Sequence, residues 1–371
     1  MKQWNYQSKT KQSTGYEDLL DQLKMYTKEK YSKEDEVGRK KIQEEVLALY
    51  RSKDIYPITY YNEQGIRDEI LKCINKQVSF EGNVLNLKFN QGQSLCRFLM
   101  PNLHGVAVKG ANNNDMLSRF YDDHKLKRAI DFCLRFKKSV TPAEIRTALE
   151  MIGGGFATNY KTMNAKALFE RYTPKGGTIY DFASGFGGRM LGALSSKNDY
   201  TYIAVEPCEE TFKNLQVLGK HIEDVTKRNN SYELHMVGSE EFVGEPCSVD
   251  FAFSSPPYFN LEQYSSEESQ CYVKYPTLDE WFDGYVQPTI ENIYNMLKDD
   301  CYYAVNIADF NVGKERVEFV DKWIELSVAQ GFEHVETIGQ KLQTRRGVGH
   351  KENGVDKDKK EGIYVFKKVS K

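Results

Sequence analysis

Hydrophobic and polar residues repeat with two different periods along the chain, and the period changes near residue 150. Before that point the spacing is mostly helical, with Ile42, Val46 and Leu49 forming one apolar stripe. Thr141-Pro142-Ala143-Glu144 has the residues of a capping box with proline in the first turn, so a helix is expected to start there. Residues 78–80 and 84–89 alternate or nearly so and predict a short hairpin or a small sheet. Residues 1–150 are therefore predicted to be a mostly helical accessory region.

From residue 151 onward, short apolar runs alternate with amphipathic segments, which is typical of a parallel α/β sheet. The pattern predicts strands at 178–182, 201–205, 232–237, 249–253 and 301–307, and helices at 189–196, 209–221, 278–297 and 315–329. Pro288 should kink or divide the third of these helices. Two further strands, at 333–338 and 362–367, are predicted to close the sheet as an antiparallel pair. Residues 151–371 are thus expected to form one α/β domain.

The overall charge changes this picture little. The 371 residues include 51 basic and 53 acidic side chains, a net charge of −2, which argues against a histone-like positive surface but not against a local basic groove. Seven scattered cysteines without a C-x-x-C pair predict reduced thiols, with neither a disulfide framework nor a metal site. Because no apolar run has the length of a signal peptide or a membrane span, we expect a cytoplasmic protein that does not contact membranes.

A glycine-rich turn follows the predicted strand 178–182 and reads Asp181-Phe182-Ala183-Ser184-Gly185-Phe186-Gly187-Gly188-Arg189. Glycines let the backbone pass close to a ligand, and the helix that follows offers free amide hydrogens. Glu206 ends the next predicted strand, where a carboxylate can bind both hydroxyls of a ribose. The spacing D-x-x-x-G-x-G differs from the G-x-G-x-x-G of dinucleotide sites, so the turn indicates another nucleoside-bearing cofactor. A purely structural turn is the alternative.

A second motif, Ser255-Pro256-Pro257-Tyr258, follows the predicted strand 249–253. Ligands of open α/β sheets bind beyond the carboxyl ends of strands, and this motif stands at such an end. The hydroxyl of Ser255 and the carbonyl of Pro256 can each accept a hydrogen bond from an amino group, and the prolines hold both acceptors in place. The ring of Tyr258 offers a stacking surface for an unstacked base. An ordinary turn can have this sequence, but its position favours a site that aims an exocyclic amine at a methyl donor.

The two motifs resemble those of the DNA amino-methyltransferases, which transfer a methyl group from S-adenosylmethionine to adenine N6 or cytosine N4. The resemblance covers roughly residues 155–370, and residues 159–169 look like the helix and loop that border the cofactor in that family. It implies a Rossmann-like methyltransferase fold, and the general look is that of phage and bacterial orphan members. By this resemblance the cofactor would contact Asp181, Ala183, Gly185, Gly187 and Glu206, and the base would contact Ser255, Pro256, Pro257 and Tyr258.

Two departures from the family pattern matter. Serine at position 255 excludes proton removal by a carboxylate there, and within the family it leans toward cytosine N4. Gly238-Ser239, after the third predicted strand, lacks the acidic residue that often holds the adenine amino group of the cofactor. Glu240 or Glu241 could take that place, or either could be surface charge.

The expected partner is DNA, either single-stranded or with the target base flipped out of the duplex. Residues 259–276 could cover a flipped base or be an ordinary connection. Residues 340–361, with Arg345 and Arg346, could grip phosphates or form a solvated charged loop. For the basic helical segment 126–149, packing is favoured over DNA recognition. An RNA amine methyltransferase is the alternative enzyme, and a non-catalytic nucleic-acid-binding relative is the alternative of another class; the oligomeric state stays open.

Overall fold

The computed structural model describes residues 6–80, 82–85, 89–108, 115–152, 155–226, 229–312, 315–341, 351–352, 355–356 and 360–370. The chain divides into two compact units. The helical unit comprises Met1–Asp68, Ser94–Thr158 and Glu262–Ser265, and the sheet unit comprises Glu69–Gln93, Asn159–Leu261 and Ser266–Lys371. The two units are therefore not separated at one point in the sequence, because Glu69–Gln93 belongs to the sheet unit and Glu262–Ser265 to the helical unit. The predicted domains 1–150 and 151–371 stay predictions.

The helical unit is built as its sequence predicts, from amphipathic helices of moderate length. Its described helices are α1 Tyr6–Leu23, α2 Lys28–Lys33, α3 Glu36–Lys53, the first turns of α4 Glu63–Asn75, α5 Gln93–Leu99, the 3-10 helix η1 Pro101–Gly105, α6 Met116–Tyr121, α7 Asp123–Phe136 and α8 Pro142–Ile152. A two-residue strand, β2 Ala107–Val108, pairs antiparallel with β7 Glu262–Gln263. On α3 the buried stripe is completed by Leu47 and Tyr50, while Leu49 is only half-buried.

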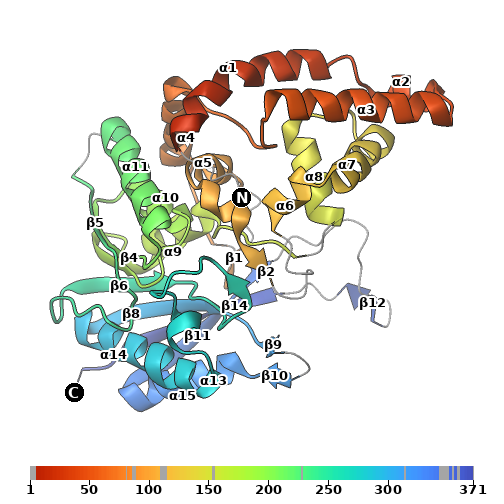
Figure 1. The fold of residues 1–371 in the computed structure, drawn as a ribbon. Helices are drawn as coiled ribbons and strands as arrows, with labels where there is room; N and C mark the ends of the chain where they lie inside the picture. Colours follow the sequence, from red (N-terminus) through yellow and green to blue (C-terminus); the bar gives the residue numbers. More distant parts are fainter. Residues whose placement is uncertain are drawn as a thin grey trace. The chain divides into compact units, whose positions relative to one another are not determined.

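The sheet unit contains one sheet of eight strands in the order β1-β11-β14-β8-β6-β3-β4-β5 (Figure 1). The strands are β1 Val84–Leu85, β3 Gly177–Asp181, β4 Tyr200–Val205, β5 Ser231–His235, β6 Val249–Ser254, β8 Leu297–Ile307, β11 Phe332–Lys341 and β14 Lys360–Lys368. Strands β5, β4, β3, β6 and β8 run parallel, and β14 runs antiparallel between β8 and β11. All five predicted parallel strands and the closing pair are present, so the predicted Rossmann-like methyltransferase fold, with helices preceding it, is confirmed.

Helices cover both faces of this sheet. The remaining elements are α9 Thr162–Tyr172, α10 Gly188–Leu194, α11 Glu209–Thr226, α12 Cys271–Lys274, α13 Leu278–Trp281, the π-helix η2 Phe282–Val286, α14 Gln287–Met296, α15 Phe319–Gln330, and the short strands β9 Phe310–Val312, β10 Glu315–Val317, β12 Lys351–Glu352 and β13 Val355–Asp356. In Figure 1, α9, α10 and α11 lie on one side of the sheet, and α13, α14 and α15 lie on the other.

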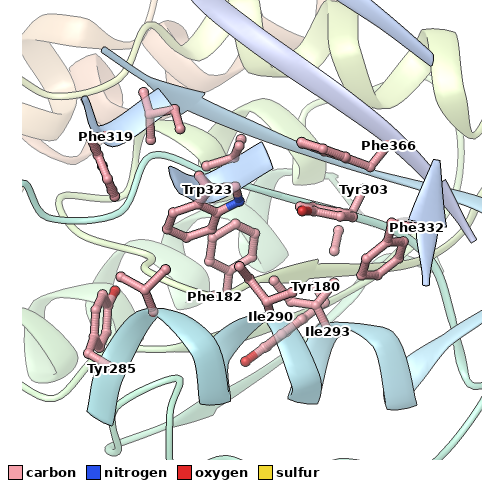
Figure 2. Close-up of a cluster of buried hydrophobic side chains, with 14 of the residues drawn as sticks. Tyr180, Phe182, Tyr285, Ile290, Ile293, Tyr303, Phe319, Trp323, Phe332 and Phe366 are labelled. Carbon is pink, nitrogen blue, oxygen red and sulfur yellow. The ribbon is translucent and has the colours of Figure 1, made fainter. Parts of the chain in front are cut away.

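An aromatic core lies between the sheet and α14 and α15. Figure 2 shows Trp323 of α15 among sheet residues and the inward face of α14, which contributes Ile290 and Ile293. Tyr303 stacks on Phe366 at 4.7 Å between ring centroids, a contact worth about 0.5–1.5 kcal/mol beyond the buried area. Buried residues of β6 and β8 belong to this core, and the candidate catalytic motif follows β6 directly.

Two predicted elements differ in the structure, and a third agrees with its prediction. A short hairpin or a small sheet is predicted from residues 78–80 and 84–89; both are wrong, because β1 joins the large sheet by pairing parallel with the distant β11 and residues 78–80 form no strand. The helix predicted at 315–329 begins only at Phe319, since residues 315–317 pair with β9. The helix predicted at 278–297 is divided by η2 just before Pro288, as expected, and its capping box at Thr277 is formed.

Candidate functional site

The two sequence motifs meet at the carboxyl ends of neighbouring strands. β3 ends at Asp181 and β6 ends at Ser254, and the two strands pair in parallel. The hydroxyl of Ser254 donates to the Asp181 carboxylate at 2.7 Å and lies 3.2 Å from the carbonyl oxygen of Ala183. Ser254 immediately precedes the Ser255 motif, so these bonds tie the start of the glycine turn to the strand end from which the motif continues, although 73 residues separate Ser254 from Asp181.

The Asp181 carboxylate is completely buried and is already occupied by internal partners. Besides Ser254, it accepts from Nε of Arg189 at 2.8 Å, from the hydroxyl of Tyr202 at 2.5 Å and from the amide of Ala183 at 3.3 Å. Burial by itself would lower the pKa of the Arg189 guanidinium, but the adjacent Asp181 carboxylate raises that pKa overall. In this structure Asp181 therefore shapes the turn, and the direct cofactor contact predicted for it stays a prediction.

The turn itself has the backbone that its glycines predict. Gly185 has φ 56° and Gly187 has φ 77°, left-handed values that glycine adopts without strain. α10 begins immediately afterwards, at Gly188. The first backbone amides of this helix therefore follow the turn directly, an arrangement that nucleotide-binding turns also have.

The segment just before α9 is hydrogen-bonded to this turn; that residues 159–169 border a cofactor stays a prediction. Asn159 donates through Nδ2 to the carbonyl of Phe186 at 2.8 Å and accepts through Oδ1 from the amide of Gly188 at 3.3 Å. A Cβ atom at Gly188 would collide with the carbonyl oxygen of Tyr160, so only glycine allows this approach. Sequence reasoning did not single out Asn159, whose partners become apparent only in the folded chain.

Glu206 follows β4 directly and is half-buried. The sequence predicts that its carboxylate binds the ribose hydroxyls of a cofactor. Its two oxygens accept from the amide of Gly185 at 3.0 Å and from the amide of Cys208 at 2.9 Å. Burial raises the pKa of this carboxyl group to about 7, although both amide hydrogen bonds oppose the change. Each oxygen keeps a lone pair, so the group can still accept hydroxyl hydrogens.

The structure distinguishes the two acidic candidates that follow β5. The side chain of Glu240 is 2% exposed and that of Glu241 is 54% exposed, and both pair with Lys274, at 3.1 and 2.8 Å. Burial raises the pKa of Glu240. Its second oxygen, Oε2, is buried and has no hydrogen-bond donor among the residues that the structure describes. Glu240 is therefore a buried acceptor with spare capacity, whereas Glu241 is surface charge.

Ser255 is half-buried, and its hydroxyl donates to the backbone carbonyl of Asn306 on β8 at 3.2 Å. A serine hydroxyl has one hydrogen and two lone pairs. With the hydrogen directed at Asn306, the remaining capacity of Ser255 is that of an acceptor. Asn306 is itself held by a hydrogen bond to Gly362 of β14 at 3.0 Å, so the neighbouring strands orient this group.

The other three residues of the Ser255 motif also pack against the protein. Pro256 is buried, Pro257 and Tyr258 are half-buried, and the chain then turns through φ 46° at Phe259. The ring of Tyr258 meets Phe310 and Phe319 edge to face, with centroids 5.8 and 5.7 Å apart. These contacts position the ring from the side of β9 and α15.

The remaining sequence candidates lie elsewhere or outside the described residues. In the segment 259–276, residues 262–265 belong to the helical unit, and the others return to the sheet unit. Arg345 and Arg346 lie outside the described residues, as does most of the segment 340–361. Basic side chains of α7 are engaged in ion pairs, among them Lys127 with Glu44 at 2.5 Å and Arg135 with Asp131 at 2.8 Å.

Two further properties concern the described part of the chain only. None of its helices combines the length and the apolar character that crossing a membrane requires. Its His, Cys, Asp and Glu side chains form no group of three or more that could hold a metal ion.

Comparison with known proteins adds a likeness of fold. No protein-family model matches the chain, and no curated protein matches its sequence. Among solved structures, the chain is similar to the cyclase SpnF (12% identity, 56% of this chain and 83% of that one, TM-score 0.39). It is also similar to an S-adenosylmethionine-dependent methyltransferase from Methanosarcina mazei (14%, 55% and 98%, 0.37) and to a geranyl diphosphate methyltransferase in complex with S-adenosylmethionine (10%, 61% and 90%, 0.40).

Proposed function

We propose that this protein transfers a methyl group from S-adenosylmethionine to the exocyclic amine of a DNA base. The observation that carries the proposal is the junction at Ser254. It joins the turn suited to a nucleoside-bearing cofactor to a motif that presents hydrogen-bond acceptors for an amine. Donor and acceptor of the methyl group would then be held at the ends of two adjacent strands, β3 and β6.

Several features of the sheet unit fit the cofactor. The carboxylate of Glu206 can accept hydrogen bonds from both ribose hydroxyls. The Oε2 of Glu240, to which no described residue donates, can accept a hydrogen from the adenine amino group. Gly185 and Gly187 carry no side chains, so the cofactor could approach the backbone of the turn closely. When bound, S-adenosylmethionine supplies a methyl group on a positively charged sulfur, so the protein needs no covalent nucleophile.

The Ser255 motif fits the target amine. The Ser255 hydroxyl, with its hydrogen given to the Asn306 carbonyl, and the Pro256 carbonyl would each accept one N–H of an –NH₂ group. Two acceptors on one amine draw the nitrogen lone pair out of conjugation with the base ring and direct it at the methyl carbon. Tyr258 would stack on the base, a contact worth about 1–3 kcal/mol. The methylated nitrogen would lose its extra proton to water, because the motif contains no carboxylate.

The direct test is mass spectrometry of nucleosides from a bacterial host that lacks its own DNA methyltransferases and expresses this protein. We expect N4-methyldeoxycytidine or N6-methyldeoxyadenosine, and serine at position 255 favours the cytosine product. Ser255→Ala should lower the methylated fraction about 10–100-fold while S-adenosylmethionine still binds, since one acceptor is lost. Ser231→Ala, at an exposed position on β5, should leave the methylated fraction unchanged.

Other outcomes would point to the alternatives. Methylated amines found only in RNA nucleosides would replace DNA with RNA as the substrate. Absence of methylation in both, together with no calorimetric signal for S-adenosylmethionine, would contradict the enzymatic proposal and leave a non-catalytic nucleic-acid-binding relative.

A further inference from the structure

The segment that follows the Ser255 motif returns to the sheet unit and lies against the start of α11. Through Oε2, Glu267 accepts a hydrogen bond from the backbone amide of Glu209, the first residue of α11, at 3.2 Å. Through Oε1, it accepts from the thiol of Cys208 at 3.7 Å. One carboxylate therefore binds two consecutive residues that lie 58 and 59 positions earlier in the chain.

Cys208 belongs to the short connection that joins Glu206 to α11. It is buried, and it donates its amide to the Glu206 carboxylate at 2.9 Å and its thiol to Glu267 at 3.7 Å. Next to it, the carbonyl of Pro207 accepts from the hydroxyl of Ser269 at 3.0 Å. Each of the three residues after Glu206 is thus contacted by a side chain of the distant segment.

The position of Glu267 suits a carboxylate. The first amides of a helix have no partner within the helix, and the helix dipole favours a negative charge beside them. Glu267 is half-buried, so water competes less for its hydrogen bonds than it would at the open surface. Removal of this carboxylate would take from Glu209 and Cys208 the acceptor that they share. The connection would then lose a fixed point next to Glu206.

The segment is anchored at its other end as well. Lys274 ends α12 and pairs with Glu240 at 3.1 Å and with Glu241 at 2.8 Å, beyond the end of β5. At the start of α12, the sulfur of Cys271 accepts from the indole Nε1 of Trp281 at 3.4 Å, and both side chains are buried. The chain that carries Glu267 is therefore held in place by contacts of its own.

We propose that Glu267 is a positioning residue for ribose recognition. It holds Cys208 so that the carboxylate of Glu206 is oriented toward the two ribose hydroxyls of the cofactor. The inference rests on the cofactor assignment in the proposed function, and Glu267 acts through Cys208 without a contact of its own to the cofactor. Because its segment continues from the Ser255 motif, the part of the chain that would hold the base also fixes the part that would hold the ribose.

The test compares two ligands by isothermal titration calorimetry: S-adenosylhomocysteine and an analogue of it that lacks both ribose hydroxyls. For Glu267→Ala we expect about tenfold weaker binding of S-adenosylhomocysteine, because Glu206 is no longer held in position. The analogue offers Glu206 no hydroxyl, so it should bind Glu267→Ala as tightly as it binds the unaltered protein. Equal binding of the analogue also shows that the variant is folded.

Three further variants serve as controls. Glu268→Gln removes the neighbouring, exposed carboxylate and should bind both ligands as the unaltered protein does. Glu267→Gln keeps one acceptor oxygen and should recover part of the lost affinity. The double variant Glu206→Gln with Glu267→Ala should bind S-adenosylhomocysteine no more weakly than Glu206→Gln alone, since the effect of Glu267 is exerted through Glu206.

A loss that is confined to the ligand with hydroxyls, and that disappears in the Glu206→Gln background, supports the proposal. An equal loss for both ligands would give Glu267 a merely structural role at the start of α11 and overturn it, as would unchanged binding of both. Failure of the unaltered protein to bind S-adenosylhomocysteine would contradict the cofactor assignment and this inference with it. The measurements need no methyl acceptor, so they decide the role of Glu267 even if no DNA base is methylated.

Discussion

At the scale of single residues, Glu206 shows how burial and hydrogen bonding compete at one carboxyl group. Its pKa rises from 4.5 to about 7 because burial disfavours the charge, while the amides of Cys208 and Gly185 hold part of that charge. The folded protein therefore binds a proton more tightly than the unfolded chain does. Without a ligand, this residue makes folding less favourable as the pH rises from about 4.5 to about 7.

This leads to a pH dependence of cofactor binding. In the proposed function, ribose hydroxyls would donate to the ionised carboxylate of Glu206, so S-adenosylmethionine should bind more tightly as the pH rises to about 7 and level off above it. We expect about tenfold tighter binding at pH 7.5 than at pH 5.5, measured by isothermal titration calorimetry. Glu206→Gln should bind more weakly and lose the rise with pH. A rise of equal size in Glu206→Gln would place the titrating group elsewhere.

Asp181 shows the limit of sequence reasoning at this scale. The sequence identifies a carboxylate at the end of a strand, before a glycine turn. It does not reveal that Arg189, Tyr202 and Ser254 already bond to that carboxylate, because two of these partners come from neighbouring strands. Local pattern identifies the residue, but the hydrogen bonds that its carboxylate accepts form only when the sheet is assembled.

At the scale of elements, the fully buried ammonium group of Lys166 ties α9 to the end of α4. Its Nζ donates to the carbonyl oxygens of Cys73, Ile74 and Lys76 at 2.8, 3.1 and 2.9 Å. These carbonyls lie at the carboxyl end of α4, where helical backbone acceptors lack internal partners and the helix dipole favours a cation. One side chain therefore satisfies three backbone groups of another helix.

Replacing this group should loosen α4. Lys166→Met removes three hydrogen bonds and should lower the free energy of unfolding by about 2–4 kcal/mol in urea denaturation. Hydrogen exchange of the last amides of α4 should accelerate as well. Lys213→Met, which alters an exposed lysine paired with Glu209 on α11, should change stability by less than about 0.5 kcal/mol. Equal effects of the two substitutions would contradict the role assigned to Lys166.

At the scale of the whole molecule, the two units offer separate probes of unfolding. Trp281 and Trp323 are fully buried in the core of the sheet unit, and the third tryptophan, Trp4, lies outside the described residues. In a Trp4→Phe background, tryptophan fluorescence therefore reports the sheet unit. Hydrogen exchange of buried amides in α7 reports the helical unit.

Cofactor binding should then stabilise one unit selectively. S-adenosylmethionine at about 100 times its Kd should raise the free energy of unfolding reported by tryptophan by about 2.7 kcal/mol. Protection of the α7 amides should stay unchanged if the units unfold independently. A nucleotide without the amino-acid tail, such as ATP, serves as the control ligand. An unchanged tryptophan transition would contradict cofactor binding in the sheet unit.

Much of the architecture was determined by sequence alone. The five parallel strands, the closing pair and the division of a helix at Pro288 follow from periodicity and from proline geometry, which act within a few residues. The wrong hairpin at 78–89 marks the limit of that reasoning, because β1 takes its partner from β11, more than 250 residues away by number. Local pattern predicts an element well, but it does not predict a distant pairing partner.

Only the tertiary structure decided how the chemical groups are used. It showed that Glu240 is buried and Glu241 is exposed, and that the hydroxyl of Ser255 donates its hydrogen to the carbonyl of Asn306. The physical reason is the same in each case. Burial and hydrogen-bond partners arise when segments remote in sequence pack together, so residue type and spacing can nominate a functional group but cannot show whether it is free to bind.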